Sequence, residues 1–297
     1  MRRIILLGGL IAVGGLTAVV AQQQQQPRPP LPDAIKVKDN LWVITSSTPG
    51  PEFTGGNTGI FVTDSGVILV DTKLSGYGPT ILEKVKKITD KPVTTIINTH
   101  THGDHTGSNE AFPATVDIVA HENTKANMAK MPAFQGEKAS FLPKRTYKDK
   151  LTIGSGRNRV DLYYFGAGHT NGDTFVVYPA LRVLQTGDMF AWRDAPTIDR
   201  NNGGSGIEFP KTLAKAIAAI TDVDTVIPGH SPVTTPKDLQ QFQRFMTEWI
   251  AAVQAAAAAG KSAEEATKSI DLASKYSGYK SDRYAAAVTA LYAEIKK

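Results

Sequence analysis

Three histidines and one aspartate crowd a short segment of the chain. They are His100, His102, Asp104 and His105, and they follow directly on a β-branched, apolar run at Thr94–Asn98 that predicts a strand. In an extended segment, residues two apart point to the same side, so His100 and His102 can bind one metal ion. The spacing therefore predicts a metal centre at the end of a strand.

A turn would bring the rest of this segment to the same place. Gly103 follows His102 and tolerates backbone angles that other residues avoid. We expect the chain to reverse there, so that Asp104 and His105 face a second ion beside the first.

The absence of cysteine restricts which chemistry is available. With no cysteine among 297 residues, disulfides, Cys-ligated zinc, iron–sulfur clusters and cysteine nucleophiles are excluded. Any metal must be bound through imidazole nitrogen and carboxylate oxygen. Those ligands suit zinc at a hydrolytic site, with iron or manganese as the alternatives.

The His100–His105 run, of the form HxHxDH, resembles the signature of the metallo-β-lactamase superfamily. The resemblance extends from about residue 33 to about residue 235. It includes one motif before the His100–His105 run and three motifs after it, in the family's order. These are Val70–Thr72 with Asp71, Gly166–Asp173 with His169, Gln185–Asp188 with Asp188, and Ile227–His230 with His230.

The resemblance implies a role for each of these residues. One metal site would contain His100, His102 and His169, and the other would contain Asp104, His105 and His230. Asp188 would bridge the two ions, and Asp71 would hold the metal loop by hydrogen bonds. The sixth histidine, His121, follows a predicted strand, and for it we expect a surface or capping role.

The implied chemistry is hydrolysis by two zinc ions. They share a water and lower its pKa toward neutrality, which gives a metal-bound hydroxide that attacks a carbonyl carbon. Asp104 is the expected catalytic residue, because it would orient the nucleophile and carry a proton to the leaving group. His102 favours zinc hydrolysis over oxygen or nitric oxide reduction, since flavodiiron relatives have an acid at that position.

The substrate class follows less directly. An aspartate at the bridging position, here Asp188, is the pattern of glyoxalase II, lactonases and many general hydrolases, whereas the best-known β-lactamases have cysteine or serine there. The Ala-rich stretch Ala251–Ala259 shows no basic surface for glutathione. We therefore expect a small ester, lactone, thioester or amide as substrate. A β-lactam-hydrolysing enzyme is the nearest alternative, and a non-catalytic metal-binding sensor is the alternative of another class.

Two loops are expected to overhang the metals and contact the substrate. One is Ser46–Asn57, rich in Gly, Pro and Ser, and the other is Met189–Phe209 after the bridging aspartate. The pattern leaves open whether their aromatic residues contact substrate or only pack the loops. The candidates for substrate contact are Phe53, Phe190, Trp192 and Arg193.

The elements that position these residues alternate between strands and helices, which indicates one α/β domain. Strands are predicted at Ala34–Lys38, Leu41–Thr45, Thr58–Val62, Val67–Val70, Thr94–Asn98, Val116–Ala120, Asn158–Phe165, Thr174–Tyr178, Leu181–Gln185 and Thr225–Ile227. Helices are predicted at Pro79–Thr89, Glu122–Met131 and Lys211–Ile220. The resemblance implies a four-layer αβ/βα sandwich with the metals at one edge, between two sheets.

The last quarter of the chain is predicted to be helical. Thr235 can cap a helix with Pro236 at its first position, and that helix should end at Gly260. Ser262 begins a capping box for a second helix, and Ser281 is expected to open a third. A stripe of apolar residues on the first helix predicts core packing. Its members are Leu239, Phe242, Phe245, Met246, Trp249 and Val253.

The amino terminus has the features of an export signal. The basic start Met1–Arg3 precedes an apolar run, Ile4–Val20, and a small residue at position 21, so we expect a signal peptide at 1–21. A Gln- and Pro-rich linker at 22–32 would lead to the hydrolase domain at 33–297. The predicted location is periplasmic or secreted, without stable membrane insertion after cleavage. An uncleaved N-terminal membrane anchor is the alternative.

The expected partner is a small-molecule substrate. With 41% hydrophobic and 21% charged residues, the composition is that of a globular protein. A net charge of +5 without clustered basic runs does not indicate a nucleic-acid partner.

Overall fold

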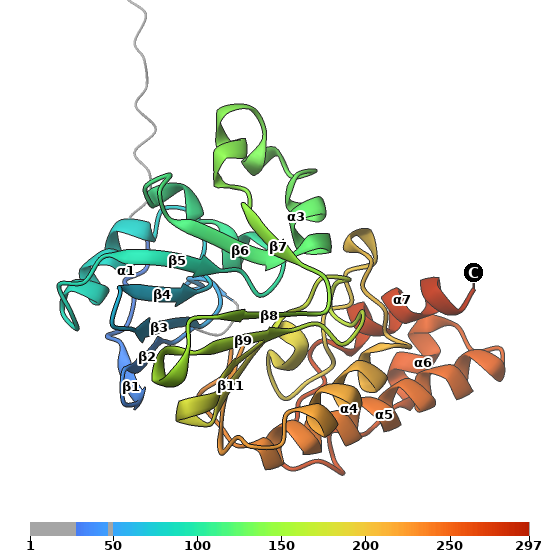
Figure 1. Cartoon of the computed structure of the whole chain (residues 1–297). Helices are drawn as coiled ribbons and strands as arrows, with labels where there is room; N and C mark the ends of the chain where they lie inside the picture. Colours follow the sequence, from blue (N-terminus) through green and yellow to red (C-terminus); the bar gives the residue numbers. More distant parts are fainter. Residues whose placement is uncertain (1–27, 47–49, 297) are drawn as a thin grey trace, which may run out of the picture.

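Two β-sheets face each other in the computed structural model, which describes residues 28–46 and 50–296 (Figure 1). Seven strands form the first sheet: β1 (Ile35–Lys38), β2 (Leu41–Ile44), β3 (Thr58–Val62), β4 (Val67–Val70), β5 (Val93–Ile97), β6 (Asp117–His121) and β7 (Arg145–Tyr147). Five form the second: β8 (Lys150–Ile153), β9 (Val160–Tyr163), β10 (Phe175–Tyr178), β11 (Val183–Gly187) and β12 (Thr225–Pro228).

The strand directions place several loops at one edge of each sheet. In the first sheet the strands lie in chain order; β1–β4 pair antiparallel, and β4–β7 pair parallel. In the second sheet, whose order is β12-β11-β10-β9-β8, only β11 and β12 are parallel. Because parallel strands end at the same edge, the segments after β4, β5 and β6 lie close together.

Helices cover the outer face of each sheet, which confirms the four-layer αβ/βα arrangement with added C-terminal helices (Figure 1). Two helices accompany the first sheet, α1 (Gly78–Lys86) and α3 (Glu122–Met128), and the one-turn α2 (Gly103–Thr106) follows β5. The helices on the second sheet are α4 (Phe209–Ala219), α5 (Pro236–Ala258), α6 (Ala263–Ser269) and α7 (Tyr284–Ile295).

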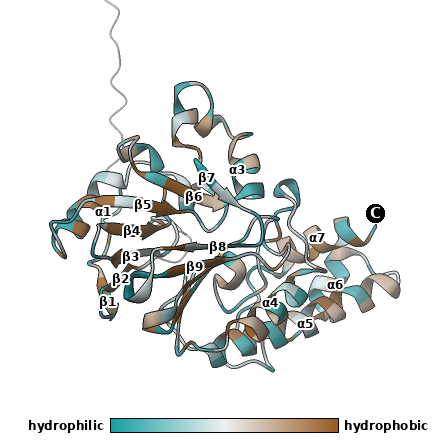
Figure 2. Cartoon of the chain, in the orientation of Figure 1, coloured by the Kyte–Doolittle hydropathy of each residue, from teal (hydrophilic) through white to brown (hydrophobic). Residues whose placement is uncertain are grey.

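Strand β4 shows why the layers form. All four of its residues are apolar and buried, as expected for a strand covered on both faces. Because side chains alternate along a strand, Ile68 and Val70 face the second sheet, whereas Val67 and Leu69 pack with Ile81 of α1. Hydropathy colouring shows the central strands as the most hydrophobic elements (Figure 2).

The C-terminal helices pack on the second sheet as predicted. Thr235 and Asp238 form a capping box at the start of α5, with Pro236 in the first turn. The predicted apolar stripe of α5 is buried, and Trp249 is 0% exposed. Ser262 caps α6 through a capping box with Glu265.

Three expectations about local structure were wrong, and two strands were not predicted. Gly103 has no positive φ, and the chain reverses because α2 begins there. Strands β7 and β8 were missed. Helix α7 begins after Arg283, so Ser281 does not cap it. Leu31, assigned to the linker, is 5% exposed and packs in the core beside Tyr77, because α1 and the first sheet leave an apolar surface there.

The predicted signal peptide at 1–21 and most of the linker lie outside the described residues. Across 28–46 and 50–296, no helix has both the length and the apolar character needed to cross a membrane.

Candidate metal centre

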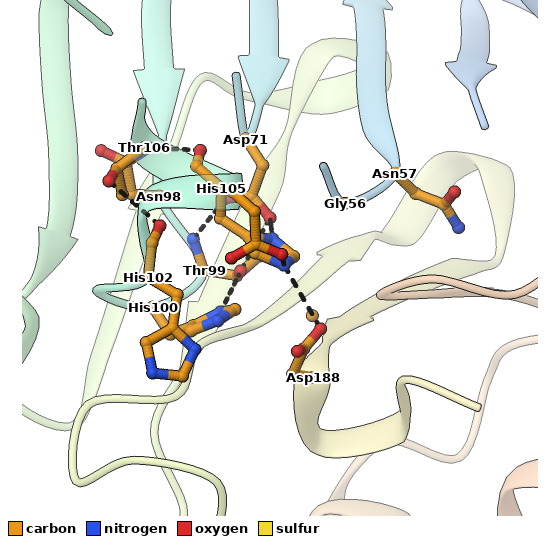
Figure 3. Close-up of polar contacts among 12 residues, drawn as sticks. Gly56, Asn57, Asp71, Asn98, Thr99, His100, His102, His105, Thr106 and Asp188 are labelled. Carbon is orange, nitrogen blue, oxygen red and sulfur yellow. Dashed lines mark hydrogen bonds and ion pairs between the residues drawn. The ribbon is translucent and has the colours of Figure 1, made fainter. Parts of the chain in front are cut away.

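The seven predicted ligands come together at one edge of the two sheets. Figure 3 shows four of them, His100, His102, His105 and Asp188. Each lies just after a strand or in a loop that returns to this edge. The loop after β5 supplies His100 and His102, α2 supplies Asp104 and His105, the β9–β10 loop supplies His169, the turn after β11 supplies Asp188, and the turn after β12 supplies His230. The first sheet thus contributes four of these side chains, and the second sheet contributes three.

The ligand atoms form two groups. His100, His102, His169 and Asp188 have ligand atoms within 4.8 Å of one another, and so do those of Asp104, His105 and His230.

Asp188 lies between the groups. Its Oδ1 is 3.3 Å from His105 Nε2 and 3.2 Å from His230 Nε2, and its Oδ2 is 3.6 Å from His169 Nε2. This position is the one that a bridging carboxylate would occupy.

Each imidazole has one nitrogen directed away from the cluster, toward a neighbouring oxygen. The pairs are His100 Nδ1 with Thr99 Oγ1 at 3.0 Å, His102 Nε2 with Asp199 at 2.7 Å, His105 Nδ1 with Asp71 at 2.7 Å, His169 Nδ1 with the Thr197 carbonyl at 2.7 Å, and His230 Nδ1 with Ser46 Oγ at 3.2 Å. Such contacts fix the ring orientation of histidines that bind metals. The remaining nitrogens all point into the cluster.

Asp71 supports two parts of the metal loop. Its carboxylate accepts hydrogen bonds from the Thr99 backbone N–H at 2.8 Å and the Thr99 hydroxyl at 2.7 Å, and it contacts His105. Thr99 in turn contacts His100, so one buried carboxylate orients imidazoles of both groups. Asp71 has φ +64°, a conformation that asparagine and aspartate tolerate better than most residues.

The inward-facing atoms fit a cation. His169 Nε2 and His102 Nδ1 lie 2.9 Å apart, although their opposite nitrogens contact a carbonyl and a carboxylate, respectively. When both imidazoles are neutral, the two inward nitrogens present lone pairs, which repel unless a cation lies between them. His100 Nε2 and Asp188 Oδ1 are buried without a hydrogen-bond partner, as expected of atoms that bind a metal.

The pKa shifts describe the same electrostatics. Burial lowers the pKa of His169 to about 4 and lowers the pKa of His100 well below its usual range, so both imidazoles are neutral. Burial acts the same way on His105, but the nearby carboxylates, Asp104 first, raise its pKa well above the usual range. The carboxylates around His105 therefore create a negative potential that attracts a cation.

A close approach of the chain completes the second group. Gly56 lies against the His105 ring, where a Cβ would be 2.2 Å from Cε1. Its backbone N–H also donates to the Asp104 carbonyl at 2.9 Å. Only glycine leaves room for His105 at this position.

A cavity of about 600 Å³ opens over the cluster. Phe53 and Trp192 form walls close to His230, with ring centroids 5.5 Å and 5.2 Å from that imidazole. Met131 and Phe134 line it from the segment after α3. Two of the four candidates for substrate contact, Phe53 and Trp192, therefore lie at the metal centre.

The other two candidates lie elsewhere. Phe190 is 1% exposed and stacks on Phe242 of α5, because a 3₁₀ turn after β11 directs it into the core. Arg193 forms an ion pair with Asp238 at 2.6 Å. Neither lines the cavity of about 600 Å³ over the cluster.

His121 caps a helix. Its Nδ1 accepts a hydrogen bond from the Asn123 backbone N–H at the start of α3, and its ring stacks on Tyr164. The predicted capping role is confirmed, but the side chain is buried rather than on the surface.

Sequence reasoning missed three residues near the centre. Asp199 contacts His102, and Arg283 lines the cavity from the C-terminal region. Lys73 is buried below the cluster, where its Nζ donates to backbone carbonyls. Asp199 lies within the Met189–Phe209 loop, so an acidic residue in that predicted cleft loop was the available signal.

Known proteins with similar sequences and folds share this architecture. Residues 51–230 match the family model of the metallo-beta-lactamase superfamily. A metallo-beta-lactamase type 2 of Bacillus sp. (strain 170) is 23% identical over 67% of this chain and 76% of its own length, and one of Elizabethkingia meningoseptica is 25% identical over 81% and 94%. The structure of a metallo-beta-lactamase from Pontibacter korlensis has a TM-score of 0.62 at 21% identity, over 72% of this chain and 98% of that one.

Proposed function

This chain belongs to the metallo-β-lactamase superfamily and is a metal-dependent hydrolase, and from that premise we propose that it is an exported dinuclear zinc enzyme. Its reaction is the hydrolysis of a small ester, lactone, thioester or amide at the carbonyl carbon. The observation that carries the proposal is the pair of ligand groups joined at Asp188. Three histidines with Asp188 would hold one ion, and Asp104, His105 and His230, again with Asp188, would hold the other.

Bound zinc would supply two things, a water with its pKa lowered toward neutrality and a Lewis acid for the carbonyl oxygen. The protein supplies orientation. Asp71 and Asp199 hold His105 and His102, and so keep the inward nitrogens in place. Apolar Phe53 and Trp192 reduce access of bulk water on one side of the cavity.

Asp104 is the residue proposed to move the proton. Burial would raise its pKa, but His105 and His230 lower it to about 2, so the carboxylate is ionised. Its Oδ2 lies 3.3 Å from His230 Nε2, and the side chain lines the cavity. From there Asp104 can accept a hydrogen bond from the attacking water and pass a proton to the leaving group.

Two features favour a small, partly apolar substrate. The cavity volume of about 600 Å³ lies within the usual range for small-molecule sites, and its lining includes the apolar side chains of Phe53, Met131, Phe134 and Trp192. β-Lactam hydrolysis is the second candidate activity, favoured by the relatives of Bacillus and Elizabethkingia that are named as metallo-beta-lactamases.

Export is the remaining part of the proposal. It is supported by the basic and apolar residues at 1–20, which would be removed after residue 21. The protein would then act in the periplasm or outside the cell. Retention of this segment as an N-terminal anchor is the alternative location.

The test is turnover by the zinc-loaded mature chain on four substrates: an aryl ester, a lactone, a thioester and a β-lactam. We expect hydrolysis of at least one, with about two zinc ions per chain by elemental analysis. Chelation and His102→Ala should each abolish turnover. His121→Asn is the matched control, because it changes a histidine outside the cluster to another residue that caps helices.

Three results would decide against parts of the proposal. Activity that survives both chelation and His102→Ala would exclude the metal mechanism. Turnover of only the β-lactam would favour the second candidate activity. Stoichiometric zinc binding without turnover of any substrate would favour a non-catalytic metal-binding sensor.

A further inference from the structure

Helix α7 lies against a loop that orients two histidines of the metal centre. This loop, residues 194–206, contacts the first ligand group at two points. The Thr197 carbonyl accepts a hydrogen bond from His169 Nδ1 at 2.7 Å, and the Asp199 carboxylate contacts His102 Nε2 at 2.7 Å. One loop therefore holds two of the three imidazoles in that group.

The loop also packs directly on the segment that contains His169. The backbone N–H of Asp199 donates to the His169 carbonyl at 2.9 Å, and that of Ser205 donates to the Gly168 carbonyl at 2.9 Å. A Cβ on Gly204 would lie 2.3 Å from the His169 carbonyl oxygen, so the two backbones are in close contact. Any shift of the loop would therefore disturb the position of His169.

Glu294 holds this loop from the side of the C-terminal helices. Its Oε1 accepts a hydrogen bond from the Ser205 hydroxyl at 2.5 Å, and its Oε2 accepts one from the Gly206 backbone N–H at 2.8 Å. Oε1 also lies 3.4 Å from Nη1 of Arg200, and the Glu294 side chain is only 12% exposed. Both carboxylate oxygens thus bind the loop that contains Asp199.

The position of Glu294 is unfavourable for the helix alone. Helix α7 ends at Ile295, and a carboxylate in the last turn of a helix lies at the negative end of the helix dipole. Glu294 is also the only acidic residue in Tyr284–Ile295. Its hydrogen bonds to the loop offset the unfavourable position, so the contact with the loop overrides the local preference of the helix.

The other end of α7 contacts the same loop. Arg283 directly precedes the helix, and its Nη2 donates to Thr197 Oγ1 at 2.7 Å. The carbonyl of that threonine is the acceptor for His169. The helix is therefore attached to the loop at both ends, once beside the residue that holds His169 and once beside the turn that follows Asp199.

The second ligand group is oriented from a different part of the molecule. His105 Nδ1 contacts Asp71 at 2.7 Å, and His230 Nδ1 contacts Ser46 Oγ at 3.2 Å. Asp71 follows β4 and Ser46 follows β2, both in the first sheet. A change at α7 should therefore affect the first ligand group more than the second.

We propose that Glu294 is a positioning residue for the first metal site. By holding residues 194–206 against the His169 segment, it keeps His102 and His169 in place, so the C-terminal helix sets the affinity of one zinc ion and not of the other. The inference rests on the proposed function, because zinc at this centre is part of it. Helix α7 lies outside residues 51–230, which match the family model.

The test measures the two stepwise zinc affinities of the mature chain in competition with a chromophoric chelator. His169→Ala identifies the step that belongs to the first ligand group. The variants are Glu294→Ala and Glu294→Gln, and the matched control is Glu248→Ala. Glu248 is an acid of α5 that pairs with Lys275 at 2.7 Å, so it has a polar partner outside the 194–206 loop. Melting temperatures of the metal-free proteins are compared first.

We expect Glu294→Ala to weaken the first-group step by about tenfold and to change the other step by less than about twofold. Glu294→Gln keeps one oxygen acceptor, so it should weaken the same step less. Glu248→Ala should change neither step. Equal weakening of both steps by Glu294→Ala, or a lower Tm with neither step weakened, would overturn the inference. If Glu294→Ala does not fold, Glu294→Gln decides in the same way, by unequal or equal effects on the two steps.

Failure of the proposed function is distinguishable from failure of this inference. If the wild type binds no zinc, the proposed function fails, and NMR of the metal-free protein decides on Glu294. The proton measured is that on His169 Nδ1, which is buried and donated to the Thr197 carbonyl. The inference predicts that this proton exchanges with solvent several-fold faster in Glu294→Ala than in the wild type and Glu248→Ala. Equal exchange rates in the three proteins would overturn it.

Discussion

Replacing Lys73 with methionine should change how the stability of the protein depends on pH. The Lys73 side chain is 0% exposed, and its Nζ donates to the carbonyls of Ile44, Thr45 and Gly56 at 3.1, 3.2 and 2.6 Å. Burial lowers the pKa of Lys73 to about 7, against the opposing effect of Asp71 and then Asp104. In the unfolded chain this pKa returns to its ordinary value of 10.5.

The sign follows from proton binding. Between the two pKa values the unfolded chain keeps the Lys73 proton and the folded chain loses it, so the free energy of unfolding rises with pH. At 1.36 kcal/mol per pH unit, this one group contributes a rise of about 2.5 kcal/mol between about pH 7.5 and about pH 9.5. Below the folded pKa both states keep the Lys73 proton, so this group no longer makes the free energy of unfolding depend on pH. Lys73→Met removes this contribution at every pH.

The assay is urea unfolding of the wild type and Lys73→Met at several pH values in this range, with a chelator present. All other titrating groups are common to both proteins, so the difference between their free energies of unfolding reports Lys73. We expect that difference to grow by about 2.5 kcal/mol in favour of the wild type as the pH rises. Lys91→Met is the control, because exposed Lys91 donates to only one carbonyl, that of Thr63.

If the free energies of unfolding of the wild type and Lys73→Met change with pH in parallel, this reasoning is refuted. Such a result would mean that Lys73 keeps its proton throughout, and that the three carbonyls, which match the three hydrogens of an ammonium group, offset the cost of burial.

Three further predictions concern the metal centre. Asp199→Ala leaves His102 Nε2 without its partner, so zinc affinity should fall by about 10- to 100-fold in a competition titration, and an unchanged affinity would mean that the contact does not orient the ring. Gly56→Ala puts a methyl group against His105 and should lower the zinc content, whereas Gly103→Ala meets nothing within 4 Å and should keep it; equal zinc contents would contradict the packing argument. Adding zinc to the chelated protein should raise Tm, by the equivalent of about 2.7 kcal/mol at about 100 times Kd, and a Tm insensitive to zinc would argue against a metal centre.

The local pattern of the sequence was sufficient for much of the fold. The strands at Thr58–Val62 and Val67–Val70 were predicted with the bounds that they have, because each is a continuous apolar, β-branched run and Asp64–Gly66 separates them. Strands β7 and β8, Arg145–Tyr147 and Lys150–Ile153, were missed. They are short and carry polar residues, and they form because the neighbouring strands β6 and β9 pair with them.

The ligand positions could be predicted because the family motifs lie in short, specific segments of sequence. The residues around them could not, because their roles depend on contacts between distant segments. Asp199 lies 97 residues from His102, and Arg283 lies 86 residues from Thr197. The direction of an aromatic side chain in a loop was equally undetermined, since one turn separates buried Phe190 from Trp192 at the cavity.

The division of the ligands between the two sheets has a consequence for the order of folding. His100 to His105 belong to the first half of the chain, and His169, Asp188 and His230 belong to the second, so neither half contains either complete group. High-affinity binding therefore requires the two sheets to have docked already, and zinc should slow unfolding more than it speeds folding. A chain divided at the β7–β8 connection, Lys148–Asp149, would give two fragments whose reassociation depends on the metal. Binding of the ion would therefore indicate that the two sheets have docked.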